Sequence, residues 1–172
     1  MAYELTSEQS IFAQSVRGLA ERHLTNDALK RAHDPAFPFD VARLMARNGL
    51  LGIMLPEQDG GQGGTVFDAI VAIDQVAQIC PRSADVVQAG NFGPIRTFAE
   101  FATQDQKDRF LPDLLAGNTV ISLCMSEPQA GSAVTELSTQ AKFDGGNIVI
   151  NGTKVFSTHS PDASVFLVYV RF

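Results

Sequence analysis

The chain has 172 residues, of which 45% are hydrophobic and 19% charged, and its formal net charge is −6. These proportions are those of an ordinary globular protein with one or two small domains. The negative charge disfavours binding to nucleic-acid phosphates, and the longest apolar run, Val165 to Val170, is too short to cross a bilayer. The N-terminal sequence Met1-Ala2-Tyr3-Glu4 lacks the basic start and apolar core of a secretory signal, so we expect a cytoplasmic protein.

The two cysteines and three histidines show no arrangement typical of a disulfide or a metal site. Cys80 and Cys124 have no partner at Cys-x-x-Cys spacing, so we expect both to be buried as small apolar side chains. His23, His33 and His159 are scattered along the chain without metal-ligand spacing. The sequence therefore predicts no metal site.

Residues 6 to about 118 show the apolar periodicity of α-helices. Thr6-x-x-Gln9 and Thr103-x-x-Gln106 are capping boxes, in which side chains satisfy free N–H groups at a helix start. Thr65 can cap a third helix, and Gly117-Asn118 is typical of a helix end. The first part of the chain is therefore predicted to be all-helical.

After Gly117 the pattern changes to that of β-strands, with a domain boundary near residue 118. Asp144-Gly145-Gly146-Asn147 predicts a turn into residues 148–150. Asn151-Gly152 is the strongest signal for a tight hairpin turn, because both residues tolerate positive φ. The fold class is therefore α+β, with a helical domain over residues 1–118 and a β-domain over residues 119–172. About five strands are expected, over residues 120–125, 136–143, 148–150, 154–158 and 164–171.

The chain stops at Phe172, in or just after the last apolar strand. A β-domain that ends there leaves unpaired edge groups or an uncovered apolar face. We therefore expect part of the β-domain to be missing from this chain.

Two glycine-bearing loops could hold a phosphate or a polar ring. Residues 60–64 match neither the dinucleotide-binding nor the Walker pattern, so a flexible connector between helices is favoured. In residues 123–132 a strand ends at Met125 and a turn follows, flanked by the hydroxyls of Ser126 and Ser132. The N–H groups of such a turn can donate to a heterocycle or a phosphate, although composition alone favours a plain β-turn.

A third segment, residues 154–158, places Phe156 and Thr158 on the same face of a predicted strand. That face could stack a ring and bond its heteroatom, while a core phenylalanine beside a satisfied threonine is the simpler interpretation. Glu127, beside a proline turn, is interpreted as a structural hydrogen-bond acceptor rather than a general base. The absence of Gly-x-Ser-x-Gly around Ser132 disfavours a serine hydrolase.

Taken in order, four blocks of sequence resemble the acyl-CoA dehydrogenase family. Residues 49–61 resemble its GLxGIxxPExxGG block, and residues 103–117 its TxxQKxxxLPxLAxG block. Residues 126–132 resemble TEPxAGSD, and residues 151–158 resemble NGxKxWITN. Each block is moderately specific, and the four together in this order are strong evidence.

The resemblance implies an N-terminal helical domain and a partial antiparallel β-barrel-like domain, with the family's C-terminal four-helix bundle absent. It also implies that FAD is the cofactor and that Ser132 contacts the acyl-CoA substrate in addition to FAD. The catalytic base would lie on the bundle beyond residue 172, so no catalytic residue is assigned. The residues implied to contact FAD are Leu123, Cys124, Met125, Ser126, Gly131, Ser132, Phe156, Ser157 and Thr158.

The implied activity is α,β-dehydrogenation of an acyl-CoA thioester in fatty acid metabolism and lipid degradation, with electrons passing to an electron-transfer flavoprotein from a homo- or hetero-oligomer. Alone, the fragment is expected to be inactive and to retain FAD weakly or not at all. Gln129, Ala133 and His159-Ser160 depart from the family pattern, whereas Ser126 and Phe156 keep its chemical types. Two alternatives remain open, a flavin-dependent monooxygenase or nitroalkane oxidase of the same fold, and a non-catalytic partner subunit of a hetero-oligomeric dehydrogenase.

Overall fold

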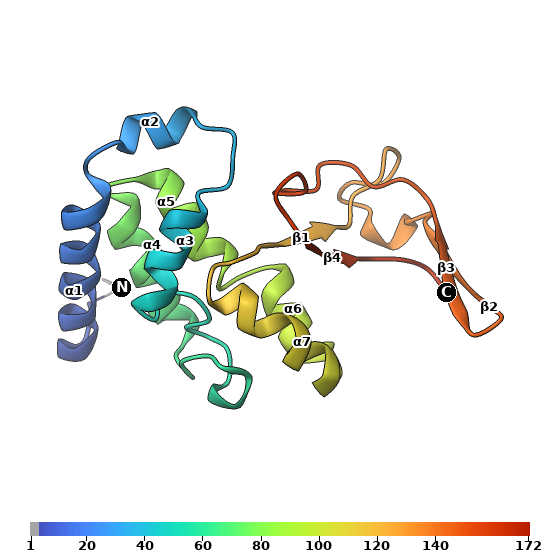
Figure 1. Cartoon of the computed structure of the whole chain (residues 1–172), viewed down its shortest axis with the longest axis horizontal. Helices are drawn as coiled ribbons and strands as arrows, with labels where there is room; N and C mark the ends of the chain where they lie inside the picture. Colours follow the sequence, from blue (N-terminus) through green and yellow to red (C-terminus); the bar gives the residue numbers. More distant parts are fainter. Residues whose placement is uncertain (1–3) are drawn as a thin grey trace.

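Helices precede strands along the chain in the computed structural model, which describes residues 4–172 (Figure 1). Residues 1–3, on which the prediction about a secretory signal partly rests, lie outside the described residues. The helices are α1 (Ser7–Leu24), α2 (Ala28–His33), α3 (Phe39–Arg47), α4 (Val66–Ala77), α5 (Pro81–Ala89), α6 (Pro94–Phe101) and α7 (Gln104–Leu115), with short 3-10 turns at Glu57–Asp59 and Val134–Glu136. The strands are β1 (Ile121–Cys124), β2 (Gln140–Asp144), β3 (Asn147–Asn151) and β4 (Val165–Val168). The predicted α+β fold class is confirmed.

Local capping starts three of the helices. Thr6 and Gln9 form a reciprocal capping box at α1, and Thr103 with Gln106 forms another at α7, as predicted. Thr65 caps α4 and is bonded in return by Asp68, which completes a third box. Each box satisfies backbone N–H groups that a helix cannot satisfy by itself.

Two apolar clusters form the core and carry the β-region. The larger one packs α1, α3, α4 and α5 together around buried side chains such as Met45 and Val76. The smaller one joins α6 and α7 to β1 through Ile95, Leu114 and Ile121, with Val165 of β4 packed against it. The β1–β4 pair is therefore seated on the helices, whereas the β2–β3 hairpin lies at the far end of the molecule (Figure 1).

The irregular segment after α3 is held by one buried side chain. Asn91 is fully buried, and its Nδ2 donates to the carbonyl oxygens of Leu50 and Val87 at 2.8 Å each. Its Oδ1 accepts a 2.6 Å hydrogen bond from the N–H of Ile53. Because buried backbone groups need partners, this amide fixes the path of the segment against α5.

The glycine-rich loop is a connector between helices, as predicted, but it is tightly bonded rather than flexible. The N–H groups of Gly61 and Gly63 donate to the carbonyls of Pro56 and Leu55. A Cβ at Gly61 would lie 2.1 Å from the Leu55 oxygen, so only glycine fits there. Lys107 of α7 adds a 3.0 Å ion pair to Asp59, whose side chain is 4% exposed.

The strands correct two sequence predictions. β2 and β3 are antiparallel with Asp144 opposite Asn147, which confirms the turn predicted at residues 144–147, whereas Asn151-Gly152 forms no hairpin turn. β1 and β4 pair in parallel, with Ile121 opposite Val165, where an antiparallel arrangement was expected. Residues 154–158 form no strand, because their polar groups bond to the loop after β1, as described below.

We predict that Asn91→Ala lowers the free energy of unfolding by about 2–3 kcal/mol, because it leaves the Leu50 oxygen and the Ile53 N–H buried without partners. Urea denaturation followed by circular dichroism measures the change. Asn26→Ala is the control, since Asn26 is exposed, and its effect should stay within about 0.5 kcal/mol. Equal losses in the two variants would contradict the assigned role of Asn91.

Candidate flavin and acyl-CoA site

The turn after β1 and the segment 154–158 lie side by side, as the sequence interpretation requires. The Val155 N–H donates to the Ser126 oxygen at 2.9 Å, and Lys154 Nζ donates to the Met125 oxygen at 3.0 Å. Further along, Ser122 Oγ donates to the Thr158 oxygen at 2.8 Å. Both stretches are thereby held at one end of β1.

Phe156 and Thr158 do not share a strand face, contrary to the prediction. Phe156 has a φ of 56° and a side chain that is 93% exposed. A left-handed residue redirects the chain, so the period-2 alternation of a strand no longer applies. The ring of Phe156 is therefore presented to solvent, neither packed in a core nor aligned with Thr158.

A pocket of about 210 Å³ lies between the α5–α6 connection and β1. Two of the residues expected to line the flavin, Leu123 and Thr158, border this pocket. The helical side of the pocket comes from Gln88, Ala89, Phe92, Gly93 and Pro94, none of which the sequence interpretation singled out. No local motif marks them, because their role depends on how the helices pack against β1.

The remaining predicted flavin residues lie around the same turn. Cys124 is buried, Met125, Ser126 and Ser157 are half-buried, and Gly131 and Ser132 are exposed. Within residues 4–172, the backbone N–H groups of Ser126, Gly131 and Ser132 donate no hydrogen bond to the protein. Three donors are thus available to a ligand, although Gly131 and Ser132 make no hydrogen bond to residues 154–158.

His159 is a pocket residue that the sequence interpretation did not assign to the site. Its φ is 62°, and its ring packs edge-on against Phe37 with centroids 4.9 Å apart. Burial lowers the pKa of His159, and the nearby charge of Arg82 lowers it further. The imidazole is therefore neutral at neutral pH. The family motif has Asn-Gly where this chain has His159-Ser160. Because asparagine and glycine both favour positive φ, that motif was the sequence signal for the left-handed backbone at this position.

Two family models match this chain. Residues 6–118 match "Acyl-CoA dehydrogenase, N-terminal domain", and residues 122–171 match "Acyl-CoA dehydrogenase, middle domain".

The chain belongs to the acyl-CoA dehydrogenase family.

The similar proteins in this acyl-CoA dehydrogenase family are named for different activities. The chain is 30% identical over 169 residues to 3-sulfinopropanoyl-CoA desulfinase of Variovorax paradoxus, covering 98% of this chain and 42% of that protein. It is 34% identical over 172 residues to the mitochondrial isobutyryl-CoA dehydrogenase of Dictyostelium discoideum, covering 97% and 40%. The chain thus spans less than half the length of these relatives.

The fold matches that of glutaryl-CoA dehydrogenase from Mycobacterium smegmatis in complex with FADH2. The TM-score is 0.87 at 23% identity, over 96% of this chain and 43% of the other. Within residues 4–172, no helix is long and apolar enough to cross a membrane. In the same range, no cluster of three or more potential metal ligands occurs, and both cysteines are buried as predicted.

In this acyl-CoA dehydrogenase chain, Glu127 holds the turn after β1 in place. Its side chain is fully buried, and its Oε1 accepts a 2.8 Å hydrogen bond from Lys154 Nζ. The N–H groups of Ser138 and Thr139 donate to it at 2.6 and 2.9 Å, and the Ser138 hydroxyl and Gln129 amide donate at 2.7 Å each. Both oxygens are occupied, so the interpretation of Glu127 as a structural acceptor is supported and a role as general base is not.

Burial raises the pKa of Glu127, but the hydrogen bonds from Lys154, Thr139 and Ser138 outweigh it. The pKa of this carboxyl is therefore held far below its ordinary value of 4.5. A carboxyl with a lowered pKa in the folded state stabilises the fold above the unfolded-state pKa and loses that contribution as the pH falls.

We predict that Glu127→Gln lowers the urea midpoint of unfolding markedly, because Lys154 is left buried without a counter-charge and an amide nitrogen faces N–H donors. Glu136→Gln, at an exposed site in the same loop, should leave the midpoint unchanged. The double variant Glu127→Gln/Lys154→Met removes the unpaired charge and should recover part of the loss. A midpoint of Glu127→Gln equal to that of Glu136→Gln would refute this role.

The carboxyl of Glu127 also makes the stability of the fold depend on pH. As the pH falls below about 4.5, the unfolded chain takes up a proton at Glu127 before the folded chain does, so stability falls. The stability difference between the native sequence and Glu127→Gln should change little between about pH 5.5 and pH 7 and should shrink as the pH falls below about 4.5. Denaturation curves at a series of acidic pH values test this, and a difference that grows on acidification would be the contrary result.

Proposed function

We propose that this chain is the first part of an FAD-dependent acyl-CoA dehydrogenase. It supplies the helical domain over residues 1–118 and a flavin-binding part of the middle domain over residues 119–172. One observation carries the proposal: hydrogen bonds from residues 154, 155 and 122 gather the two predicted flavin-contacting segments at the mouth of one pocket. Membership of the family supports the assignment of that pocket to flavin and substrate.

The groups available at this site fit a flavin. The exposed ring of Phe156 can pack against a planar heterocycle, and the free N–H groups of Ser126, Gly131 and Ser132 can donate to its polar edge or phosphates. Met125, Ser157 and Thr158 would complete the contact, together with Leu123 at the pocket wall. Cys124 would contribute backbone only, because its side chain is buried.

When bound, FAD would supply the redox chemistry, accepting a hydride from the substrate β-carbon. The chain's own contribution would be binding and orientation. The pocket walls formed by Phe92, Pro94 and Ile121 would exclude water from the acyl group. Ser132, on the exposed turn, would contact the substrate near its thioester, where hydrogen bonds stabilise developing enolate charge. No residue of this chain is assigned as the base, since Glu127 is fully engaged.

The identity of the whole reaction is a further part of the proposal. Relatives named as a desulfinase and as a dehydrogenase share this region with the chain, which supports a common role in binding flavin and a CoA thioester. We favour α,β-dehydrogenation of an acyl-CoA, because both parts of the chain match the family named for that reaction. Electron transfer to a flavoprotein partner, oligomerisation and a place in fatty acid metabolism follow from the family resemblance.

We predict that the purified chain contains little flavin but binds added FAD weakly, because only one side of the ring is covered by this chain. Quenching of flavin fluorescence in a titration measures the dissociation constant. Phe156→Ala should raise that constant about threefold to tenfold through loss of ring packing. Phe101→Ala is the matched control, since Phe101 is 77% exposed on α6 away from the site. No binding at all, or equal effects of both variants, would argue against the proposed site.

A further inference from the structure

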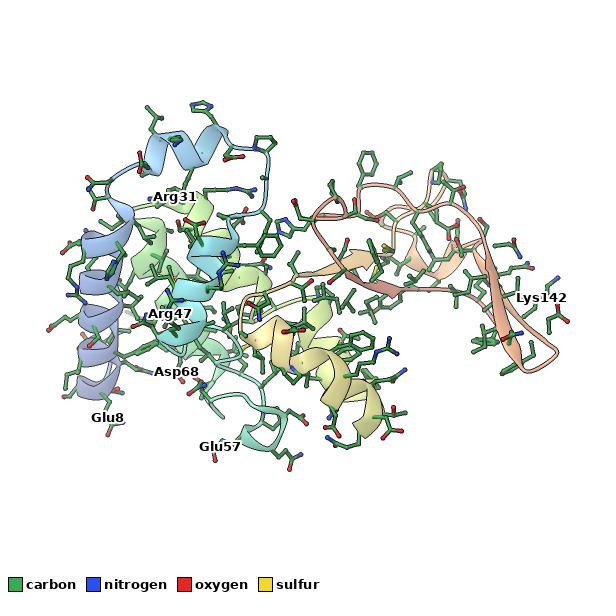
Figure 2. All side chains as sticks on the ribbon, viewed as in Figure 1. Glu8, Arg31, Arg47, Glu57, Asp68 and Lys142 are labelled. Atoms are coloured by element: carbon green, nitrogen blue, oxygen red, sulfur yellow. The ribbon has the colours of Figure 1, made fainter. Side chains whose placement is uncertain are left out.

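A thiol, a hydroxyl and a guanidinium meet at the start of α5, within the helical domain. Cys80 is the N-cap residue of α5 and is fully buried. Ser83, also fully buried, donates a 3.1 Å hydrogen bond from its Oγ to Cys80 Sγ. Arg31, on the side of α2 that faces the other helices (Figure 2), approaches the same sulfur. The proposed flavin and acyl-CoA site uses none of these three side chains.

Arg31 is held in this position by the end of α1. Its Nη2 donates to the carbonyl oxygens of Leu24 and Asn26, the second at 2.8 Å. Its Nε is buried and has no hydrogen-bond partner within residues 4–172. Because a buried donor without a partner is costly, this nitrogen indicates that the cluster is built for a negatively charged group. The sulfur of Cys80, when ionised, is such a group.

The surroundings of Cys80 favour the ionised form of its thiol. Burial raises the pKa of this thiol, but Ser83 and the Arg31 guanidinium stabilise the thiolate more strongly, so the pKa lies below its ordinary value. The start of a helix and a neighbouring arginine are settings in which protein thiols ionise readily. Since the thiolate is the nucleophile, this sulfur is more reactive than an ordinary buried cysteine.

A pocket of about 270 Å³ gives a small reagent a route toward the cluster. Arg31 borders this pocket, and other walls come from residues 34–40. Cys80 itself is not exposed, so a reagent reaches the sulfur when the Arg31 side chain moves aside or α2 opens. The six residues of α2 include none that is buried, and elements with few buried contacts open locally at low free-energy cost. A reagent close to water in size suits this route.

We propose that Cys80 is a site of oxidation by hydrogen peroxide, with Ser83 and Arg31 stabilising the reacting sulfur. The thiolate sulfur attacks one peroxide oxygen, so that an S–O bond forms and the O–O bond breaks. The hydroxide that leaves takes up a proton from solvent and becomes water. The sulfur loses two electrons, which the peroxide gains, and the product is a sulfenic acid that thiols can reduce again.

Mass spectrometry of the native chain tests the proposal, because Cys124 is a second free thiol in the same molecule. Peroxide is added together with dimedone, which traps sulfenic acids, and the rates of adduct formation at the two cysteines are compared. If exposure alone decided the rate, Cys124, at 8% exposed against 0% for Cys80, would react first. We expect Cys80 to react at least about tenfold faster. A faster reaction at Cys124, or no adduct at Cys80, would overturn the proposal.

Arg31→Met and Ser83→Ala test the two groups that stabilise the sulfur. Each should lower the rate at Cys80 about threefold to tenfold near neutral pH, shift its pH dependence to higher pH and leave the rate at Cys124 unchanged. Lys30→Met is the matched control, since it removes one positive charge from an exposed position of the same helix, and it should react like the native sequence.

Circular dichroism verifies that the three variants fold, and Ser83→Ala, which removes a single oxygen atom, decides the outcome if Arg31→Met unfolds. A faster reaction at Cys80 in Arg31→Met would mean that Arg31 only covers the thiol, which contradicts the proposal. Equal rates at Cys80 in Arg31→Met and Lys30→Met, or a native rate in Ser83→Ala, would contradict it as well.

Discussion

The buried ion pair between Lys154 and Glu127 is the constraint on which the β-region depends. The two side chains meet at 2.8 Å although 27 residues separate them, and Lys154 also bonds the Met125 oxygen. This single ammonium therefore links the end of β1, the turn after it and the segment that carries Phe156. Because a buried charge without a partner is strongly unfavourable, the pair specifies one relative placement of these segments. Leu123 and Thr158, one from each of these stretches, border the candidate pocket.

The helical domain contributes a rigid platform to this site. Ile121 and Val165 of the parallel β1–β4 pair pack on the cluster that Ile95 and Leu114 form, and the α5–α6 connection closes the pocket from the helical side. Asn91 and the bonded glycine loop fix the segment between α3 and α4. The predicted flavin-contacting turn thus rests on well-packed elements, as a precise binding site requires, whereas the β2–β3 hairpin projects from the opposite end of the β-region (Figure 1).

The two ends of the β-region differ in how completely the described residues bond their polar groups and cover their apolar side chains. Near β1, the carboxylate of Glu127 and the ammonium of Lys154 are matched by donors and acceptors from the chain itself. At the hairpin, the apolar side chains of Phe143 and Ile148 remain exposed and the β3 edge has no neighbour among the described residues. Hydrogen bonds need only a few close partners, but apolar faces need area. The described residues therefore satisfy the polar groups near β1 but do not cover the apolar side chains of the hairpin.

The sequence by itself determined the starts of α1, α4 and α7, the order of helices and strands, the family and the turn that lies beside Phe156. Capping boxes and glycine turns involve residues three or four apart, so contiguous sequence specifies them. Only the tertiary structure decided that Asn151-Gly152 forms no hairpin turn, that β1 and β4 run parallel, that Phe156 faces solvent and that His159 borders the pocket. Those outcomes depend on contacts between residues far apart in the chain, whose partners are chosen by packing and by the need to satisfy every buried polar group.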